Sequence, residues 1–116
     1  MTKAETLLRT TPAGLYCPAG DFYVDPVRPV ARAVITHGHS DHARAGHGAV
    51  LATKETLAIM GERYGEAFSD SPQAVAYGDA VTVNGVTVKL VTAGHVLGSA
   101  QAVVEQKGAR VVVSGD

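Results

Sequence analysis

Four side chains able to bind a metal ion lie within the hexad His37-Gly38-His39-Ser40-Asp41-His42. Three of the chain's five histidines belong to this segment. Imidazole and carboxylate groups are ligands that suit zinc, and also iron or manganese. The residue types and their density therefore indicate a metal centre.

The spacing within the hexad predicts two neighbouring metal positions. Side chains at positions i and i+2 of an extended segment point the same way, so His37 and His39 can bind one ion from one side. Asp41 and His42 come later in the hexad and are better placed for a second ion beside the first. A closed structural zinc site usually contains thiolates, and Cys17 is the only cysteine in the chain. We therefore expect two divalent metal ions as cofactors, zinc ahead of manganese or iron.

Two further candidate ligands follow apolar, strand-like runs. His95 comes after the run at residues 86–91 and would supply a third nitrogen ligand for the first ion. Asp116 ends the run at residues 111–116, where a carboxylate could bridge two cations. His47 lies beyond the hexad without a partner implied by its spacing, and we expect it to be a loop histidine.

The elements that must position these residues are mostly strands. Apolar residues 31–36 predict a buried strand that ends at the hexad, where α/β folds place their chemistry. One helix is expected from the N-cap Thr53 to about Tyr64, with Met60 and Tyr64 on its buried face and Gly65 ending it. Further strands are expected at residues 7–10, 21–24 and 49–52, and in two hairpins, one turning at Asn84-Gly85 and one at Lys107-Gly108.

Together, the hexad, the downstream Gly94-His95 and the terminal Gly115-Asp116 resemble the metallo-β-lactamase superfamily. Residues 93–100, AGHVLGSA, are similar to the β-CASP nuclease branch, which includes mRNA 3′-end processing factors and DNA-repair exonucleases. Residues 15–26, LYCPAGDFYVDP, resemble bacterial ligase-associated DNA exonucleases. The resemblance implies an α/β (α+β) fold, the first half of an αββα sandwich with its metals at one edge of two sheets. It would be mostly strands, with one main helix near residues 53–64.

The resemblance also implies roles for the candidate residues. The first metal would be bound by His37, His39 and His95, the second by Asp41 and His42, with Asp116 bridging both. Asp41 would also orient the attacking hydroxide and so act in catalysis. Asp25 corresponds to an early aspartate that hydrogen-bonds behind the metal ligands, although the residues alone equally allow a turn aspartate before Pro26.

The function that this resemblance implies is a metal-dependent phosphodiesterase. It would be a nuclease, an exonuclease acting on DNA ahead of RNA, with a hydroxide activated by two metals. The alternative within the superfamily is a small-molecule hydrolase that cleaves a thioester or a lactone. A β-lactamase is disfavoured by His42, and a redox di-iron enzyme by His39, where those relatives typically carry a glutamate.

Complete members of this branch are considerably longer than 116 residues. We therefore expect residues 1–116 to form a single incomplete domain, the N-terminal half of the catalytic domain, and nuclease activity to belong to the full-length protein. The last histidine ligand of the second metal and the inserted β-CASP domain would lie outside it. A third hypothesis is a non-catalytic fragment that forms a homodimer through the sheet face left uncovered.

The charge balance adds no support for a nucleic-acid partner. Ten basic and eleven acidic residues give a net charge of −1, whereas binding to a phosphate backbone normally requires a basic surface. No stretch approaches the roughly 20 apolar residues that span a membrane. Residues 1–5 lack the features of a signal peptide, and one cysteine fits a reducing compartment, so we expect a cytoplasmic protein.

Overall fold

The computed structural model describes residues 7–39, 42–92 and 99–114. Within these residues the chain forms strands and one helix, α2 (Lys54–Tyr64). The strands before the helix are β1 (Arg9–Thr11), β2 (Gly14–Cys17), β3 (Phe22–Val24), β4 (Arg32–Val34) and β5 (His47–Ala52). Those after it are β6 (Ser69–Ala74), β7 (Ala80–Val83), β8 (Val86–Thr92), β9 (Ala100–Gln106) and β10 (Ala109–Val113).

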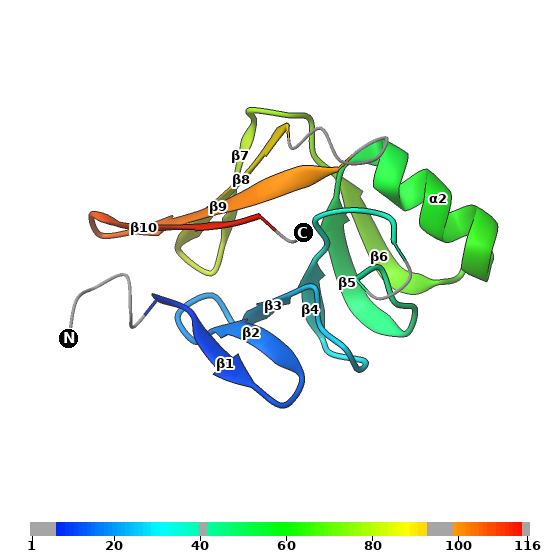
Figure 1. Cartoon of the computed structure of the whole chain (residues 1–116), viewed down its shortest axis with the longest axis horizontal. Helices are drawn as coiled ribbons and strands as arrows, with labels where there is room; N and C mark the ends of the chain where they lie inside the picture. The colour runs from blue at the N-terminus through cyan, green and yellow to red at the C-terminus, as the bar shows by residue number, and fades with distance from the viewer. Residues whose placement is uncertain (1–6, 40–41, 93–98, 115–116) are drawn as a thin grey trace.

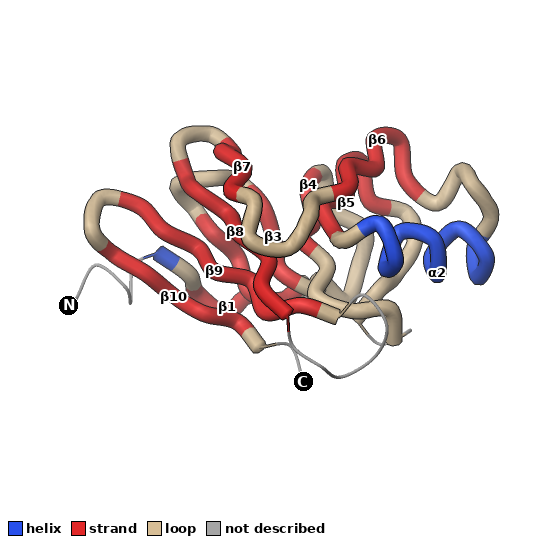
Figure 2. Tube along the Cα trace, turned by 90° about the horizontal axis from the view of Figure 1, so that it is seen from above, coloured by secondary structure: helices blue, strands red, loops and turns tan. Residues whose placement is uncertain are grey.

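The strands form two sheets, and the helix adds a third layer. One sheet has the order β1-β2-β3-β4-β5-β6 and the other the order β10-β9-β8-β7. Figure 1 shows the second sheet lying over β1–β3, with α2 beside β5 and β6. Seen from above, α2 and the four-stranded sheet lie on different sides of the molecule (Figure 2). The expected α/β fold, mostly strands with one main helix, is confirmed.

The centre of the larger sheet is parallel and buried on both faces. Strands β3, β4, β5 and β6 pair in parallel, and side chains alternate between the two faces of each strand. Ala33 and Val50 pack on the helix side with Met60, whereas Val34 and Leu51 pack on the side of the second sheet. Burial on both faces explains why the sequence at residues 33–35 of β4 and 50–52 of β5 is continuously apolar rather than alternating.

Several local predictions are confirmed. The hydroxyl of Thr53 accepts a hydrogen bond from the amide of Thr56 at 3.2 Å, as expected of a helix N-cap. Asn84 and Gly85 both have positive φ (50° and 84°), and they turn the β7–β8 hairpin as Asn-Gly pairs do. Tyr64 differs from the prediction, because it lies at the end of the helix with 38% of its surface exposed, while Met60 is fully buried.

Two strands were not predicted. Strand β2 is short, and β6 has the polar sequence SDSPQA with a proline inside it. The β6 strand lies at the edge of the sheet and is mostly exposed, so its backbone pairing with β5 rather than apolar burial makes it a strand. The described part of the chain contains no helix with the length and hydropathy needed to cross a bilayer.

The prediction of a loop histidine at position 47 is wrong. His47 is the first residue of β5, its side chain is buried, and its Nδ1 accepts a hydrogen bond from the backbone N–H of Val30 at 3.2 Å. Burial lowers the pKa of His47 from its ordinary value of 6.5, because the charged ring would lose its hydration. The core therefore favours the neutral form of this ring.

This burial predicts a pH-dependent stability that belongs to His47. Below pH 6.5 the unfolded chain takes up a proton on this imidazole while the native state does not, so stability falls as the pH falls through 6.5 and levels off below the native pKa. In His47→Asn, Oδ1 can accept the Val30 hydrogen bond in place of Nδ1 without titrating. Chemical unfolding on both sides of pH 6.5 should therefore show a flatter profile for the variant than for the wild type. Identical profiles would contradict the prediction.

Candidate metal centre

The hexad begins just beyond the carboxyl end of β4, next to both sheets. Backbone pairing continues past β4, since the N–H of Ile35 donates to the carbonyl of Leu51 at 2.9 Å. The carbonyl of Thr36 then accepts from the N–H of Ala100 in β9 at 2.7 Å. His37 follows and is buried. The hexad is therefore anchored at the junction of the two sheets, at the strand ends where α/β proteins bind ligands.

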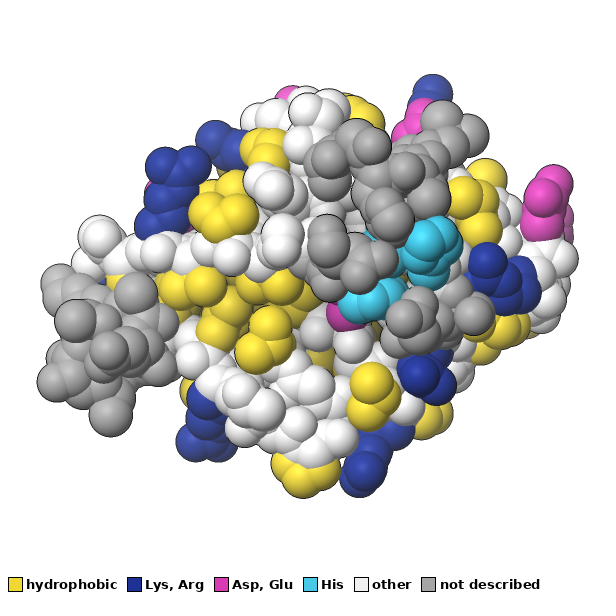
Figure 3. Space-filling model, viewed as in Figure 1, with side chains coloured by type: hydrophobic (Ala, Val, Ile, Leu, Met, Phe, Trp, Pro, Cys, Tyr) yellow, Lys and Arg dark blue, Asp and Glu magenta, His cyan; other side chains and the backbone are white. Residues whose placement is uncertain are grey.

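Three imidazoles of the hexad gather at this junction. The ring centroids of His37 and His39 are 5.0 Å apart, and those of His37 and His42 are 4.3 Å apart. The carbonyl of His39 accepts hydrogen bonds from the N–H groups of His42 and Ala43, at 2.9 and 2.8 Å, so the chain turns back on itself. This turn brings the last histidine of the hexad as close to His37 as its i+2 neighbour. Histidine side chains reach the surface together at this point (Figure 3).

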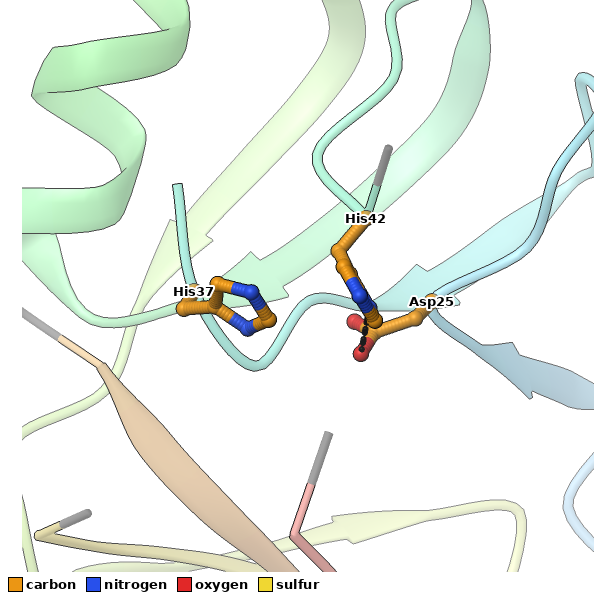
Figure 4. A group of neighbouring side chains, drawn as sticks. All are labelled: Asp25, His37 and His42. Atoms are coloured by element: carbon orange, nitrogen blue, oxygen red, sulfur yellow. Dashed lines mark hydrogen bonds and ion pairs between the residues drawn. The ribbon is translucent and has the colours of Figure 1, made fainter. Parts of the chain in front are cut away.

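The carboxylate of Asp25 accepts several hydrogen bonds behind these rings. Asp25 follows β3 with a positive φ of 47°, a backbone conformation that Asp tolerates better than most residues. Its Oδ1 accepts from the N–H of Thr36 at 2.8 Å, and its Oδ2 accepts from the Thr36 hydroxyl at 2.6 Å. Oδ2 also lies 3.0 Å from Nδ1 of His42, the contact marked in Figure 4. Burial raises the pKa of Asp25, and the hydrogen bonds from Thr36 and His42 act against that rise.

These contacts define the tautomers of His37 and His42. A carboxylate only accepts hydrogen bonds, so the single hydroxyl proton of Thr36 points to Asp25. The same hydroxyl lies 2.9 Å from Nδ1 of His37 and must then accept from it. Nδ1 of His42 likewise donates to Asp25. Both rings thus carry their proton on Nδ1, and an imidazole in this tautomer coordinates a metal through Nε2.

The geometry fits a metal ion. Possible ligand atoms of Asp25, His37 and His42 all lie within 4.8 Å of one another. Figure 4 shows the two rings and the carboxylate converging from separate segments. Because both oxygens of Asp25 already accept hydrogen bonds, this carboxylate is better suited to orienting the rings than to binding the ion. Thr36 was not among the predicted site residues, because a threonine at the end of an apolar run carries no signal of its own.

Three of the predicted ligands, Asp41, His95 and Asp116, lie outside the described residues. Described residues close in sequence to His95 and to Asp116 lie near the centre. Ala100 bonds to Thr36, and Ser114, near the end of the chain, lines the same groove as Asp25 and His42.

That groove is an extended, largely apolar depression beside the metal centre. It measures about 720 Å³ and runs between β1–β3 and β10. Its walls are mainly aliphatic, including Leu8, Leu15, Val27, Val111 and Val113. Figure 3 shows this hydrophobic band leading to the histidines.

A helix–sheet–sheet fold with imidazoles converging at the strand ends is an α/β architecture with a candidate metal centre. A family model of the metallo-β-lactamase superfamily matches residues 13–116. The chain belongs to this superfamily, whose members are typically metal-dependent hydrolases.

Individual relatives cover different shares of the chain. A probable DNA ligase from Opitutus terrae is 34% identical over 93 residues, 79% of this chain and 9% of that protein. A protein from Parabacteroides distasonis assigned as a metal-dependent hydrolase has a similar structure, with a TM-score of 0.63 and 18% identity over 88% of this chain and 55% of that one. CmlA, a diiron β-hydroxylase from Streptomyces venezuelae, has a TM-score of 0.52 and 18% identity over 77% of this chain and 20% of that one. At such identities the two structures show a common fold only, and the chain spans a minor part of the ligase.

Proposed function

We propose that the full-length protein is a metal-dependent phosphodiesterase that acts as a nuclease, and specifically as an exonuclease on DNA. The observation that carries the proposal is the convergence of three imidazoles and an orienting carboxylate at the strand ends, in a superfamily of metal-dependent hydrolases. The likeness to a probable DNA ligase supports DNA over RNA. The same likeness fits our proposal that the protein is a ligase-associated exonuclease of the β-CASP branch.

We further propose two divalent ions as cofactors, zinc ahead of manganese or iron. The proposed ligands are His37, His39 and His95 for one ion, Asp41 and His42 for the other, and Asp116 for both. When bound, these ions would supply Lewis acidity that lowers the pKa of a water and offsets negative charge on the attacked phosphoryl group.

The described residues would contribute by pre-organisation. Asp25 holds His42 directly and His37 through the Thr36 hydroxyl, so neither ring has to change its tautomer when an ion binds. Asp41 is the proposed residue that orients the attacking water. Fixed ligands of this kind lower the reorganisation needed during the reaction.

The test uses the full-length protein loaded with zinc or manganese. DNA and RNA oligonucleotides labelled at either end, single- and double-stranded, should show stepwise shortening of DNA faster than of RNA. Chelation should abolish the shortening, and restoring the metal should return it. Intact oligonucleotides under all these conditions would refute the nuclease assignment.

A second candidate, a small-molecule hydrolase, is favoured by the groove. Its walls are aliphatic where a nucleic-acid channel would be basic, and the chain carries a net charge of −1. An acyl thioester or a lactone with an apolar chain would fit such a surface. The same metal-loaded protein should therefore be assayed with acyl thioesters. Thioester hydrolysis without DNA shortening would favour this candidate.

The groove also supports the proposal that the 116-residue chain forms a homodimer when produced alone. Val112 on β10 is 51% exposed and lines the groove with Val111 and Val113, and an apolar surface of this kind favours association. Light scattering should give twice the monomer mass for the wild type and a shift toward monomer for Val112→Asp. A monodisperse wild-type monomer would contradict the proposal.

A further inference from the structure

The helix α2 makes three contacts with the hexad and the residue that follows it, all through its second half. Ile59 packs against Gly38, where an added Cβ would lie only 3.0 Å from the Ile59 side chain. Nη1 of Arg63 donates to the carbonyl of Gly38 at 2.7 Å. The hydroxyl of Tyr64 donates to the carbonyl of Ala43 at 2.8 Å. A helix that otherwise packs on the sheet thus also holds the loop that carries the imidazoles.

The two carbonyls belong to residues that are next to proposed ligands in the sequence. Gly38 lies between His37 and His39, and Ala43 directly follows His42. The backbone of the loop is otherwise closed by the carbonyl of His39, which accepts from the N–H groups of His42 and Ala43. The bonds from the helix therefore hold the loop on both sides of that turn. Carbonyls held at both positions restrict the backbone from which the three imidazoles project.

The side chains that make these bonds also contact each other. Arg63 and Tyr64 are both exposed, and an exposed arginine is ordinarily left to solvent. Here the guanidinium donates to Gly38 and lies 5.7 Å from the ring centroid of Tyr64, a cation–π contact that aligns the two side chains. A cation beside a site for cations gives no electrostatic gain in metal binding. Its value to the centre is therefore geometric.

We propose that Arg63 and Tyr64 are positioning residues of the metal centre, which hold the hexad in its ligand-binding conformation from the last turn of α2. The inference rests on the metal centre and not on the nuclease activity proposed above. Residues behind a metal site typically change metal affinity about 10- to 100-fold when they are removed. A side chain at position 38 would lie 3.0 Å from Ile59, so the Ile59 side chain or the loop would have to shift by a few tenths of an ångström.

The test titrates the metal-free full-length protein with Co²⁺, whose visible bands report ligand geometry. Tyr64→Phe removes only a hydroxyl and Arg63→Met removes only the guanidinium, and matched controls are Tyr23→Phe and Glu62→Gln. We expect each of the two variants to weaken Co²⁺ binding about tenfold, the pair up to about 100-fold, and the bands to shift. Arg63→Lys, which keeps a cationic donor, should recover part of the affinity, whereas the controls should match the wild type.

Unchanged Co²⁺ affinity and spectrum in the paired variant would overturn the inference. An equal loss in the control variants would overturn it as well, because the effect would then not be specific to the two bonds. Should Arg63→Met fail to fold, Tyr64→Phe alone decides, since it keeps the ring. A wild type that binds no Co²⁺ would overturn the metal centre itself and this inference with it, whatever the result with oligonucleotides.

Discussion

The full-length protein carrying His39→Ala is expected to hydrolyse its substrate at least ~10³-fold more slowly than the wild type. A metal ion contributes several kcal/mol of transition-state stabilisation, and each 1.36 kcal/mol is a factor of ten in rate, so losing a ligand costs orders of magnitude. The side chain of His39 is exposed, and its contribution to the turn of the hexad comes from its backbone carbonyl. The variant should therefore keep its fold while losing turnover. Initial rates, metal content by elemental analysis and thermal unfolding measure the three quantities.

The matched control for this variant is His47→Asn. It also removes one histidine, but His47 is buried in the core, where its Nδ1 accepts a hydrogen bond from the N–H of Val30. It should keep wild-type metal content and turnover at neutral pH. A His39→Ala protein as active as the wild type would remove His39 from the site and would weaken the metal-dependent mechanism as a whole.

Asp25→Asn is expected to weaken metal binding about 10- to 100-fold, the usual effect of losing an orienting partner behind a metal ligand. The carboxylate accepts hydrogen bonds from the Thr36 amide, the Thr36 hydroxyl and His42. An asparagine has one oxygen to accept and one nitrogen that can only donate, so at least one of these donors loses its acceptor. The tautomer of His42, or that of His37 through Thr36, is then no longer fixed.

The same substitution should affect stability differently from metal affinity. Burial raises the pKa of Asp25, which means that the ionised carboxylate is costly in the metal-free protein. Asn removes that cost, so the metal-free variant should unfold at a denaturant concentration close to that of the wild type. Isothermal titration with Zn²⁺ and chemical unfolding without metal test the two parts, with the exposed Asp70→Asn as control. Equal zinc affinity in Asp25→Asn and wild type would show that Asp25 does not orient the ligands.

Much of the fold could be read from local patterns. The sequence predicts a buried strand at residues 31–36 and a further strand at 49–52, and the structure has β4 and β5 there. The cap at Thr53 and the turn at Asn84-Gly85 are also where the residues predict them. Each of these signals acts between residues at most a few positions apart, through strand alternation, a capping bond or a turn conformation. Strand β6 lacked such a signal, since its polar sequence is a strand only because β5 lies beside it.

For the candidate site, too, some features could be predicted from the sequence and others only from the structure. The residue types of the hexad predict imidazoles around a metal ion, because ligand chemistry is carried by the side chains themselves. That His42 turns back to within 4.3 Å of His37 was not contained in the spacing. Neither was the role of Thr36, which follows from its position between Asp25 and His37.

By itself, then, the sequence determined the superfamily and the strands that lead to the candidate metal centre, and it predicts which ligand types that centre contains. The tertiary structure decided how the ligands are held: Asp25 meets His42 across 17 residues, and Arg63 meets Gly38 across 25. It also decided that His47 belongs to the core. The physical reason is the sequence distance over which each interaction acts. Local propensities extend over a few neighbouring residues, whereas these hydrogen bonds exist only once the helix and the sheets have packed together.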